Sequence, residues 1–249
     1  MTPVTLLPRA ALLAVLAASL PLPLAAAPAG DTALGKASEA LRQAWRQDPL
    51  TASRPFPAIR ILDSVGAVDC PSIRLPASAL LVVACPASGA ILVKRAPLAA
   101  LHGVFGEAAE LFVVAYGLGQ GLTPPSAATP PATSALRAAC AAGTLLAAVP
   151  LPPADRRLLL NNAISAGEQA FPSSAAPQLG TGPQRAYALL SGMGGTPLDC
   201  GTAAMGRLAS GAEPLEAFMA TRGTSVGIDK FCRQPPACPR RLSVGAAGI

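Results

Sequence analysis

The side chains best suited to chemistry are one histidine, six cysteines and 13 acidic residues. His102 is the only imidazole, so a site in which two histidines hold a zinc ion cannot be built anywhere in this chain. We expect His102 to be a surface or hydrogen-bonded polar group, with metal binding by His102 and a cysteine or carboxylate as the open alternative. Glu107 and Glu110 could act as an acid–base pair, but we expect them to form a solvated helix face.

The cysteines favour disulfide bonds over metal binding or thiol catalysis. They are Cys70, Cys85, Cys140, Cys200, Cys232 and Cys238. Their even number and the absence of a C-x-x-C pair are typical of an exported, disulfide-stabilised protein. Spacing alone leaves the pairing open, but the neighbours 70 with 85 and 232 with 238 are the local possibilities. That leaves Cys140 with Cys200, and we predict that these two are joined.

Motifs of other enzyme classes are absent. The chain has no G-x-S-x-G segment, and its glycine-rich stretches at 117–121 and 192–195 lack the features of phosphate-binding or dinucleotide-binding loops. We interpret Gly117, Gly119 and Gly121 as positions of close helix packing. The net charge is +6, but the arginines are scattered and form no basic stripe, so nucleic acid is not an expected partner.

Residues 1–29 have the pattern of a secretory signal peptide. Arg9 precedes an apolar run that ends in small residues, and we expect cleavage near Ala27 or Ala29. An uncleaved inner-membrane anchor is the alternative because the run has about the length of one bilayer crossing, although prolines in its second half disfavour a continuous helix. We therefore expect a periplasmic or secreted protein that touches the membrane only through this segment, if it is retained.

The remaining chain has the composition of a folded protein. Of 249 residues, 51% are hydrophobic and 13% are charged, which excludes disorder driven by charge. We expect one domain over residues 30–225 and a tail over 226–249 that carries a small cysteine loop.

The hydrophobic pattern predicts an α+β fold that is mainly helical. Two β-rich runs, 80–85 and 90–93, flank a turn at Pro86 and indicate a hairpin. Apolar residues at three- and four-residue steps predict central helices over 96–122, divided at Gly103 or Gly106. A proline-rich loop follows over 123–133. Further helices are expected at 31–47, 134–149, 155–170, 183–191 and 214–221.

Several segments of the chain follow one another in a recognisable order. Cys70 precedes the hairpin segment Cys85-Pro86-Ala87, residues 112–122 read FVVAYGLGQGL, and residues 135–143 read ALRAACAAG. This order resembles the bacterial neutral zinc metallopeptidase family, which has C-P-A-D, Y-V-I-A-H-E-x-G-H-H-V and E-L-Q-A-D-C-Y-A-G at these places. Further likenesses to that family lie at 91–93, 162–168, 179–185 and 195–200.

The resemblance implies a zincin-like scaffold with a disulfide-clipped hairpin before the central helices. It places the two zinc-binding histidines of the family at Tyr116 and Gln120, the general base at Gly117 and the acidic third ligand at Ala135. None of these residues can replace the group for which it stands, because neutral Tyr and Gln are poor zinc ligands and Gly and Ala have no donor. The family uses zinc, but we expect no cofactor in this chain.

These patterns predict an exported, catalytically inactive relative of metallopeptidases that binds an unidentified protein or peptide in the cell envelope. One alternative is a neutral zinc metallopeptidase that hydrolyses peptides through a site its motifs do not reveal. Another is a structural envelope protein whose likeness to the family is coincidental. If the first interpretation holds, the segments around Tyr116 and Ala135 must pack face to face.

Overall fold

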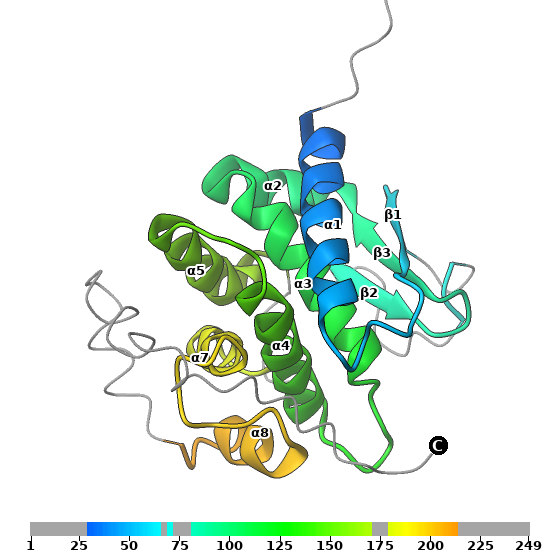
Figure 1. The fold of residues 1–249 in the computed structure, drawn as a ribbon. Helices are drawn as coiled ribbons and strands as arrows, with labels where there is room; N and C mark the ends of the chain where they lie inside the picture. Colours follow the sequence, from blue (N-terminus) through cyan, green and yellow to red (C-terminus); the bar gives the residue numbers. More distant parts are fainter. Residues whose placement is uncertain (1–28, 66–68, 72–80, 171–178, 214–249) are drawn as a thin grey trace, which may run out of the picture.

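The computed structural model describes residues 29–65, 69–71, 81–170 and 179–213, and within these ranges it has seven helices and one three-stranded sheet (Figure 1). The strands are β1 (Ala58–Leu62), β2 (Val82–Cys85) and β3 (Ala90–Lys94). The helices are α1 (Ala29–Gln47), α2 (Arg95–Phe105), α3 (Ala108–Leu122), α4 (Pro131–Ala147), α5 (Pro153–Ala170), α7 (Gly182–Gly192) and α8 (Thr202–Ala209). This confirms the prediction of a mainly helical α+β fold.

The sheet has the order β1-β3-β2, so β3 is its central strand. β1 runs parallel to β3, and β2 runs antiparallel to β3 with Val82 opposite Val93. The antiparallel pair is the predicted hairpin. Because successive side chains of a strand point to opposite faces, Val82, Ile91 and Val93 enter the main core beneath the sheet.

The other face of the sheet carries a second, smaller cluster. Cys85 and Leu92 point to this side and pack with Val65 and Cys70 of the segment that follows β1. The Cys70–Cys85 disulfide joins that segment to the end of β2. The predicted disulfide-clipped hairpin is therefore present.

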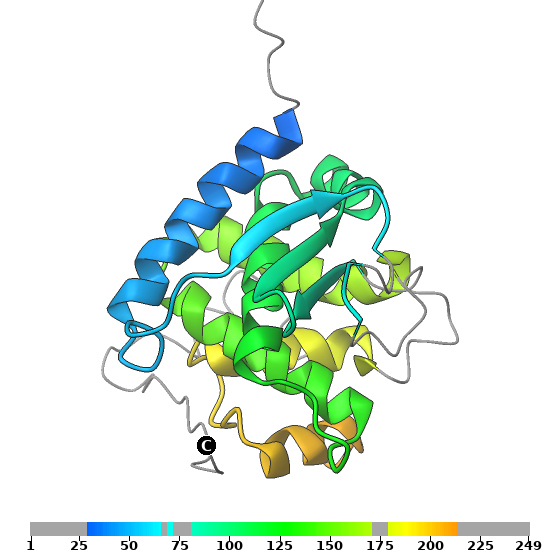
Figure 2. The same cartoon turned by 90° about the vertical axis from the view of Figure 1, so that its right-hand side faces the viewer.

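α3 is the central helix of the molecule. It contacts α1, α2, α4 and α5 as well as β2 and β3, with the sheet on one side and α4 and α5 on the other (Figure 1). In the turned view the sheet lies in front of the helices (Figure 2). Every residue from Ala108 to Gly119 is buried, as expected for a helix that is apolar nearly all round.

Glycine and alanine allow the helices around α4 to approach closely. A Cβ atom on Gly119 of α3 would overlap the carbonyl oxygen of Ala138 in α4, and one on Gly192 of α7 would overlap that of Cys140. The prediction of close helix packing is thus confirmed for Gly119. Gly117 instead packs against the sheet, and a Cβ on Gly121 would meet only an ordinary neighbour at 3.8 Å.

The second disulfide joins two segments that are distant in sequence. Cys140 of α4 is bonded to Cys200, which lies just before α8, with 5.5 Å between their Cα atoms. This confirms the predicted pair.

Several predicted boundaries need correction. The division of the central helices falls at Gly106, whose φ of 60° ends α2, and Gly103 lies within α2. α4 begins at Pro131, inside the segment predicted as loop, because proline is well tolerated in the first turn of a helix. β1 and α8 are additional elements that were not predicted from the sequence, and each is short, with five and eight residues.

Some predictions lie outside the described residues. These are the signal peptide, the helix at 214–221, the Cys232–Cys238 loop and the tail from 226. In the part of the chain that the structure describes, none of the helices has both the length and the apolarity that a bilayer crossing needs.

Candidate functional site

The four positions that the resemblance matches to a metal site lie at two contacts of α3: Tyr116 faces Ala135 of α4, whereas Gly117 and Gln120 face the sheet. Tyr116, Gly117 and Gln120 lie in the second half of α3, and Ala135 lies in the first turns of α4. The two helices pack side by side, and the Tyr116 hydroxyl donates a long hydrogen bond of 3.5 Å to the carbonyl oxygen of Ala135. The segments around Tyr116 and Ala135 therefore pack face to face.

Tyr116 fills the contact between these helices as a neutral phenol. Its side chain is 8% exposed, and its ring stacks on Phe112 with 5.9 Å between the centroids. Burial raises the pKa of the Tyr116 hydroxyl, although the Arg185 guanidinium and a hydrogen bond with Gln120 act in the opposite direction. The phenolate that could bind a metal ion is thus disfavoured at neutral pH.

Gln120 uses its amide to bind the backbone of β2. Its Oε1 atom accepts a hydrogen bond of 2.9 Å from the Ala84 N–H, and its Nε2 atom donates one of 3.3 Å to the Val82 carbonyl. One side chain thereby joins the last turn of α3 to the outer strand of the sheet. An amide held in this way is not directed at a metal ion.

Gly117 is a point of contact between α3 and the sheet. A Cβ atom at this position would overlap the Ile91 side chain and would lie 2.9 Å from Cγ2 of Val82. A carboxylate at residue 117, where the resemblance places a general base, would therefore require the Ile91 and Val82 side chains to shift.

Arg185 of α7 belongs to the same neighbourhood, although no sequence pattern predicts this. The side chain is 4% exposed, and it donates hydrogen bonds to the carbonyl oxygens of Ala163 at 3.0 Å and Gly180 at 2.5 Å. Its charge lies close enough to Tyr116 to affect the pKa of that residue. Arg185 is thus a buried cation whose guanidinium is held by backbone carbonyls of other segments.

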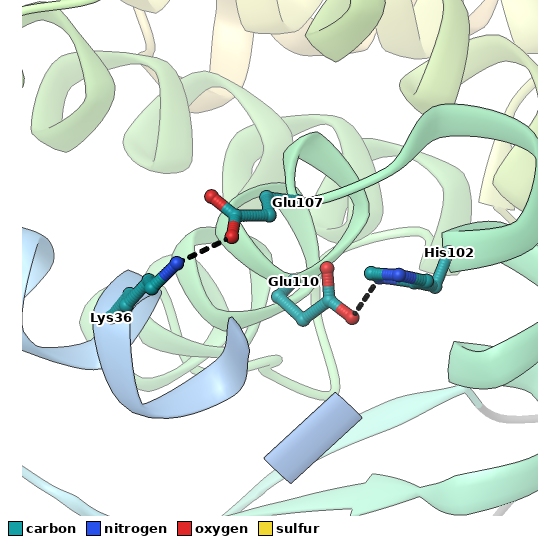
Figure 3. A network of polar contacts seen from close by, with 4 residues as sticks. All are labelled: Lys36, His102, Glu107 and Glu110. Carbon is teal, nitrogen blue, oxygen red and sulfur yellow. Dashed lines mark hydrogen bonds and ion pairs between the residues drawn. The ribbon is translucent and has the colours of Figure 1, made fainter. Parts of the chain in front are cut away.

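A second polar cluster lies at the other end of α3 (Figure 3). His102, near the end of α2, contacts Glu110 with 2.8 Å between Nδ1 and Oε1. The Glu110 side chain is completely buried, whereas that of His102 is 36% exposed. The second oxygen of Glu110 has no hydrogen-bond partner among the described residues.

The prediction of a solvated face is wrong for Glu110 and correct for Glu107. Glu107 is exposed and accepts a hydrogen bond of 2.7 Å from Lys36 of α1, which lowers the pKa of its carboxyl group. Glu110 lies one turn further along, where α3 is covered on all sides, and helical spacing alone does not reveal this cover. The expectation that His102 is a hydrogen-bonded polar group is confirmed.

Substituting His102 with alanine should destabilise the fold through Glu110. The change removes the hydrogen-bond partner of a buried carboxylate, and we expect the free energy of unfolding to fall by about 2 kcal/mol in urea titrations. The matched control is Lys36→Ala, which breaks an exposed ion pair and should have a much smaller effect. The double variant His102→Leu/Glu110→Leu should recover most of the loss. Equal effects of the two single substitutions would contradict this interpretation.

The described residues contain no group of three histidine, cysteine or acidic side chains that could hold a metal ion. The side chains at the four matched positions do not fit zinc either, because they are a neutral phenol, an engaged amide, a glycine and an alanine. Comparison with known proteins finds no matching family model, curated protein or solved structure.

Proposed function

We propose that this chain is an exported, catalytically inactive protein on the scaffold of the neutral zinc metallopeptidases, and that it binds a protein or peptide in the cell envelope. Export is supported by two disulfides, which persist in oxidising compartments, and by the apolar segment that begins the chain. The scaffold is supported by the hairpin, the central helix and the adjoining α4, which follow in the order the resemblance implies.

The observation that carries the proposal concerns the positions that the resemblance matches to metal ligands and to the general base. In this chain, three of these residues make structural contacts with neighbouring elements. Tyr116 reaches the backbone of α4, Gln120 binds the backbone of β2, and Gly117 packs against the sheet. Residues that would converge on a metal ion in the family here connect three secondary structure elements. Residues in this arrangement can hold α3 to its neighbouring elements. They cannot activate a water molecule through a metal ion, because they supply no metal ligands.

Restoring the ligands tests the scaffold. The triple variant Tyr116→His/Gln120→His/Ala135→Glu should retain about one zinc ion per chain after dialysis, because residues 116 and 120 lie one turn apart on α3 and residue 116 meets residue 135 of α4. Zinc should also raise its melting temperature, since a metal that binds only the folded state stabilises it. The matched control is Tyr116→His/Gln120→His, which keeps Ala135. It should bind zinc more weakly, because it offers two protein ligands and not three.

The wild-type protein tests the lack of catalysis. We expect it to retain no stoichiometric zinc and to leave unstructured casein uncut. Stoichiometric zinc together with cleavage that a chelator abolishes would refute the inactive assignment. A triple variant that keeps the wild-type circular dichroism spectrum but binds no zinc would remove the support for the scaffold.

One observation favours a second candidate, a hydrolase that needs no metal. His102 is a partly exposed imidazole whose Nδ1 faces the buried Glu110 side chain, and such a contact with an acidic residue orients a histidine as a general base in other hydrolases. Casein cleavage that survives a chelator and disappears in His102→Ala would favour this candidate over the first.

A further inference from the structure

The outer strand β2 has backbone groups that point away from the sheet. The N–H of Lys94 donates a hydrogen bond of 2.9 Å to the carbonyl of Leu81, so Leu81 is bonded toward β3. In an antiparallel pair, residues bonded to the neighbouring strand alternate with residues that are not. The backbone groups of Val83 therefore face β3 as well, and those of Val82 and Ala84 face the outer edge of the sheet.

The Gln120 side chain is hydrogen-bonded to two of these outward-facing backbone groups. Its amide accepts from the Ala84 N–H and donates to the Val82 carbonyl, which are bonds that a neighbouring strand would otherwise make. Gln120 is partly exposed, and the next residue is the exposed Gly121. The edge is thus closed by one side chain at the molecular surface and not by a further strand among the described residues.

The same edge is complementary to itself. If two copies of β2 lie antiparallel about a two-fold axis at Val83, Val82 of each copy stands opposite Ala84 of the other. The Val82 carbonyl of one copy then accepts from the Ala84 N–H of its partner, and the reverse bond forms by symmetry. These are the two groups that Gln120 holds. Gly121 offers no side chain beside Ala84 to obstruct the approach.

We propose that the β2 edge is a self-association site that Gln120 keeps closed. Two copies pair through β2 when the amide leaves Val82 and Ala84, and the paired sheets have six strands. An unprotected edge strand is a template for pairing with another chain, and proteins cover such edges in several ways. Among the described residues, the Gln120 amide covers the outward groups of Val82 and Ala84. The proposal does not depend on the proposed function, because it concerns only β2 and its neighbour.

The substitution Gln120→Ala tests the closure by sedimentation equilibrium. We expect this variant to dimerise with a dissociation constant at least tenfold lower than that of the wild-type protein, because the competing amide is gone. Gln120→Glu is the matched control, since its carboxylate still accepts from Ala84 but cannot donate to Val82 at neutral pH. The dimer dissociation constant of Gln120→Glu should lie between those of Gln120→Ala and the wild-type protein. Hydrogen exchange of the Ala84 amide reports whether each variant is folded and whether the edge is open.

A cysteine at residue 83 tests the geometry of the dimer. Opposite residues at a pair without hydrogen bonds have Cα atoms about 4.5 Å apart, which is close enough for a disulfide. Val83→Cys should therefore cross-link two chains in the Gln120→Ala background and much less in the wild-type background. An open Ala84 amide without stronger association would overturn the proposal. A dimer that does not cross-link at residue 83 would also overturn it, because it would use another surface.

Discussion

Replacing Gly192 with alanine should lower the free energy of unfolding by about 3 kcal/mol. A Cβ atom at Gly192 would overlap the carbonyl oxygen of Cys140, and it would lie 2.9 Å from the backbone nitrogen of Thr144. These neighbours are backbone atoms of α4, so no side chain can rotate away and the two helices must separate. Inserting one carbon into a packed interior typically costs about 1 to 3 kcal/mol, and contact with backbone places this change at the upper end.

Gly35→Ala is the matched control for this substitution. It makes the same chemical change within a helix, but a Cβ at Gly35 would meet nothing within 4 Å. Alanine is favoured over glycine inside a helix by about 1 kcal/mol, so this variant should be slightly more stable than the wild-type protein. Urea unfolding followed by circular dichroism measures both. A neutral Gly192→Ala would show that α4 and α7 do not approach as closely as described.

The elements with a strong local pattern could be predicted from the sequence. The hairpin has two β-rich runs around Pro86, and α3 has an apolar run long enough to be buried on every side. Cys140 and Cys200 could be paired because the other four cysteines are two pairs of neighbours in the sequence, which are the local possibilities. In each case the information lies within a short stretch or in a count, and it does not depend on how the chain folds.

The contacts that define the candidate site could not be predicted in this way. The burial of Glu110 depends on the elements that surround α3, and the engagement of Gln120 depends on the position of β2 at the edge of the sheet. Arg185 lies near Tyr116 only because α7 packs beside α4. All three are consequences of tertiary packing, which no spacing along the chain records.

If the chain has the metallopeptidase scaffold that we propose, its packing explains how it is stable without a metal ion. A metal ion in a structural or catalytic site fixes the elements that supply its ligands. Here α3 is held to β2 by the Gln120 amide, to the sheet by the contact at Gly117 and to α4 by the close approach at Gly119. Protein contacts thus supply the connections that a bound ion would otherwise provide.

Removing the Cys140–Cys200 disulfide should lower the free energy of unfolding even more than Gly192→Ala does. The bond closes a loop with a sequence separation of 60 residues, and the loss of chain entropy in the unfolded state predicts a stabilisation of about 4 kcal/mol. We therefore expect the double variant Cys140→Ala/Cys200→Ala to lose about this amount in urea unfolding. The loss should extend through α4, because this helix packs against α3, α7 and α8.

The double variant Cys70→Ala/Cys85→Ala is the control for this change. Its disulfide has a sequence separation of 15 residues, and the same entropy argument gives about 3 kcal/mol. Cys70 and Cys85 belong to the small cluster on the outer face of the sheet, so hydrogen exchange should increase mainly in the hairpin and leave α4 protected. If both double variants lost protection in α4 equally, the Cys140–Cys200 bond would not be the specific support of the α3–α4 contact. Tyr116 and Ala135 meet at the α3–α4 contact. If the Cys140–Cys200 bond supports this contact as expected, zinc binding by the restored triple variant should depend on that bond and not on the Cys70–Cys85 bond.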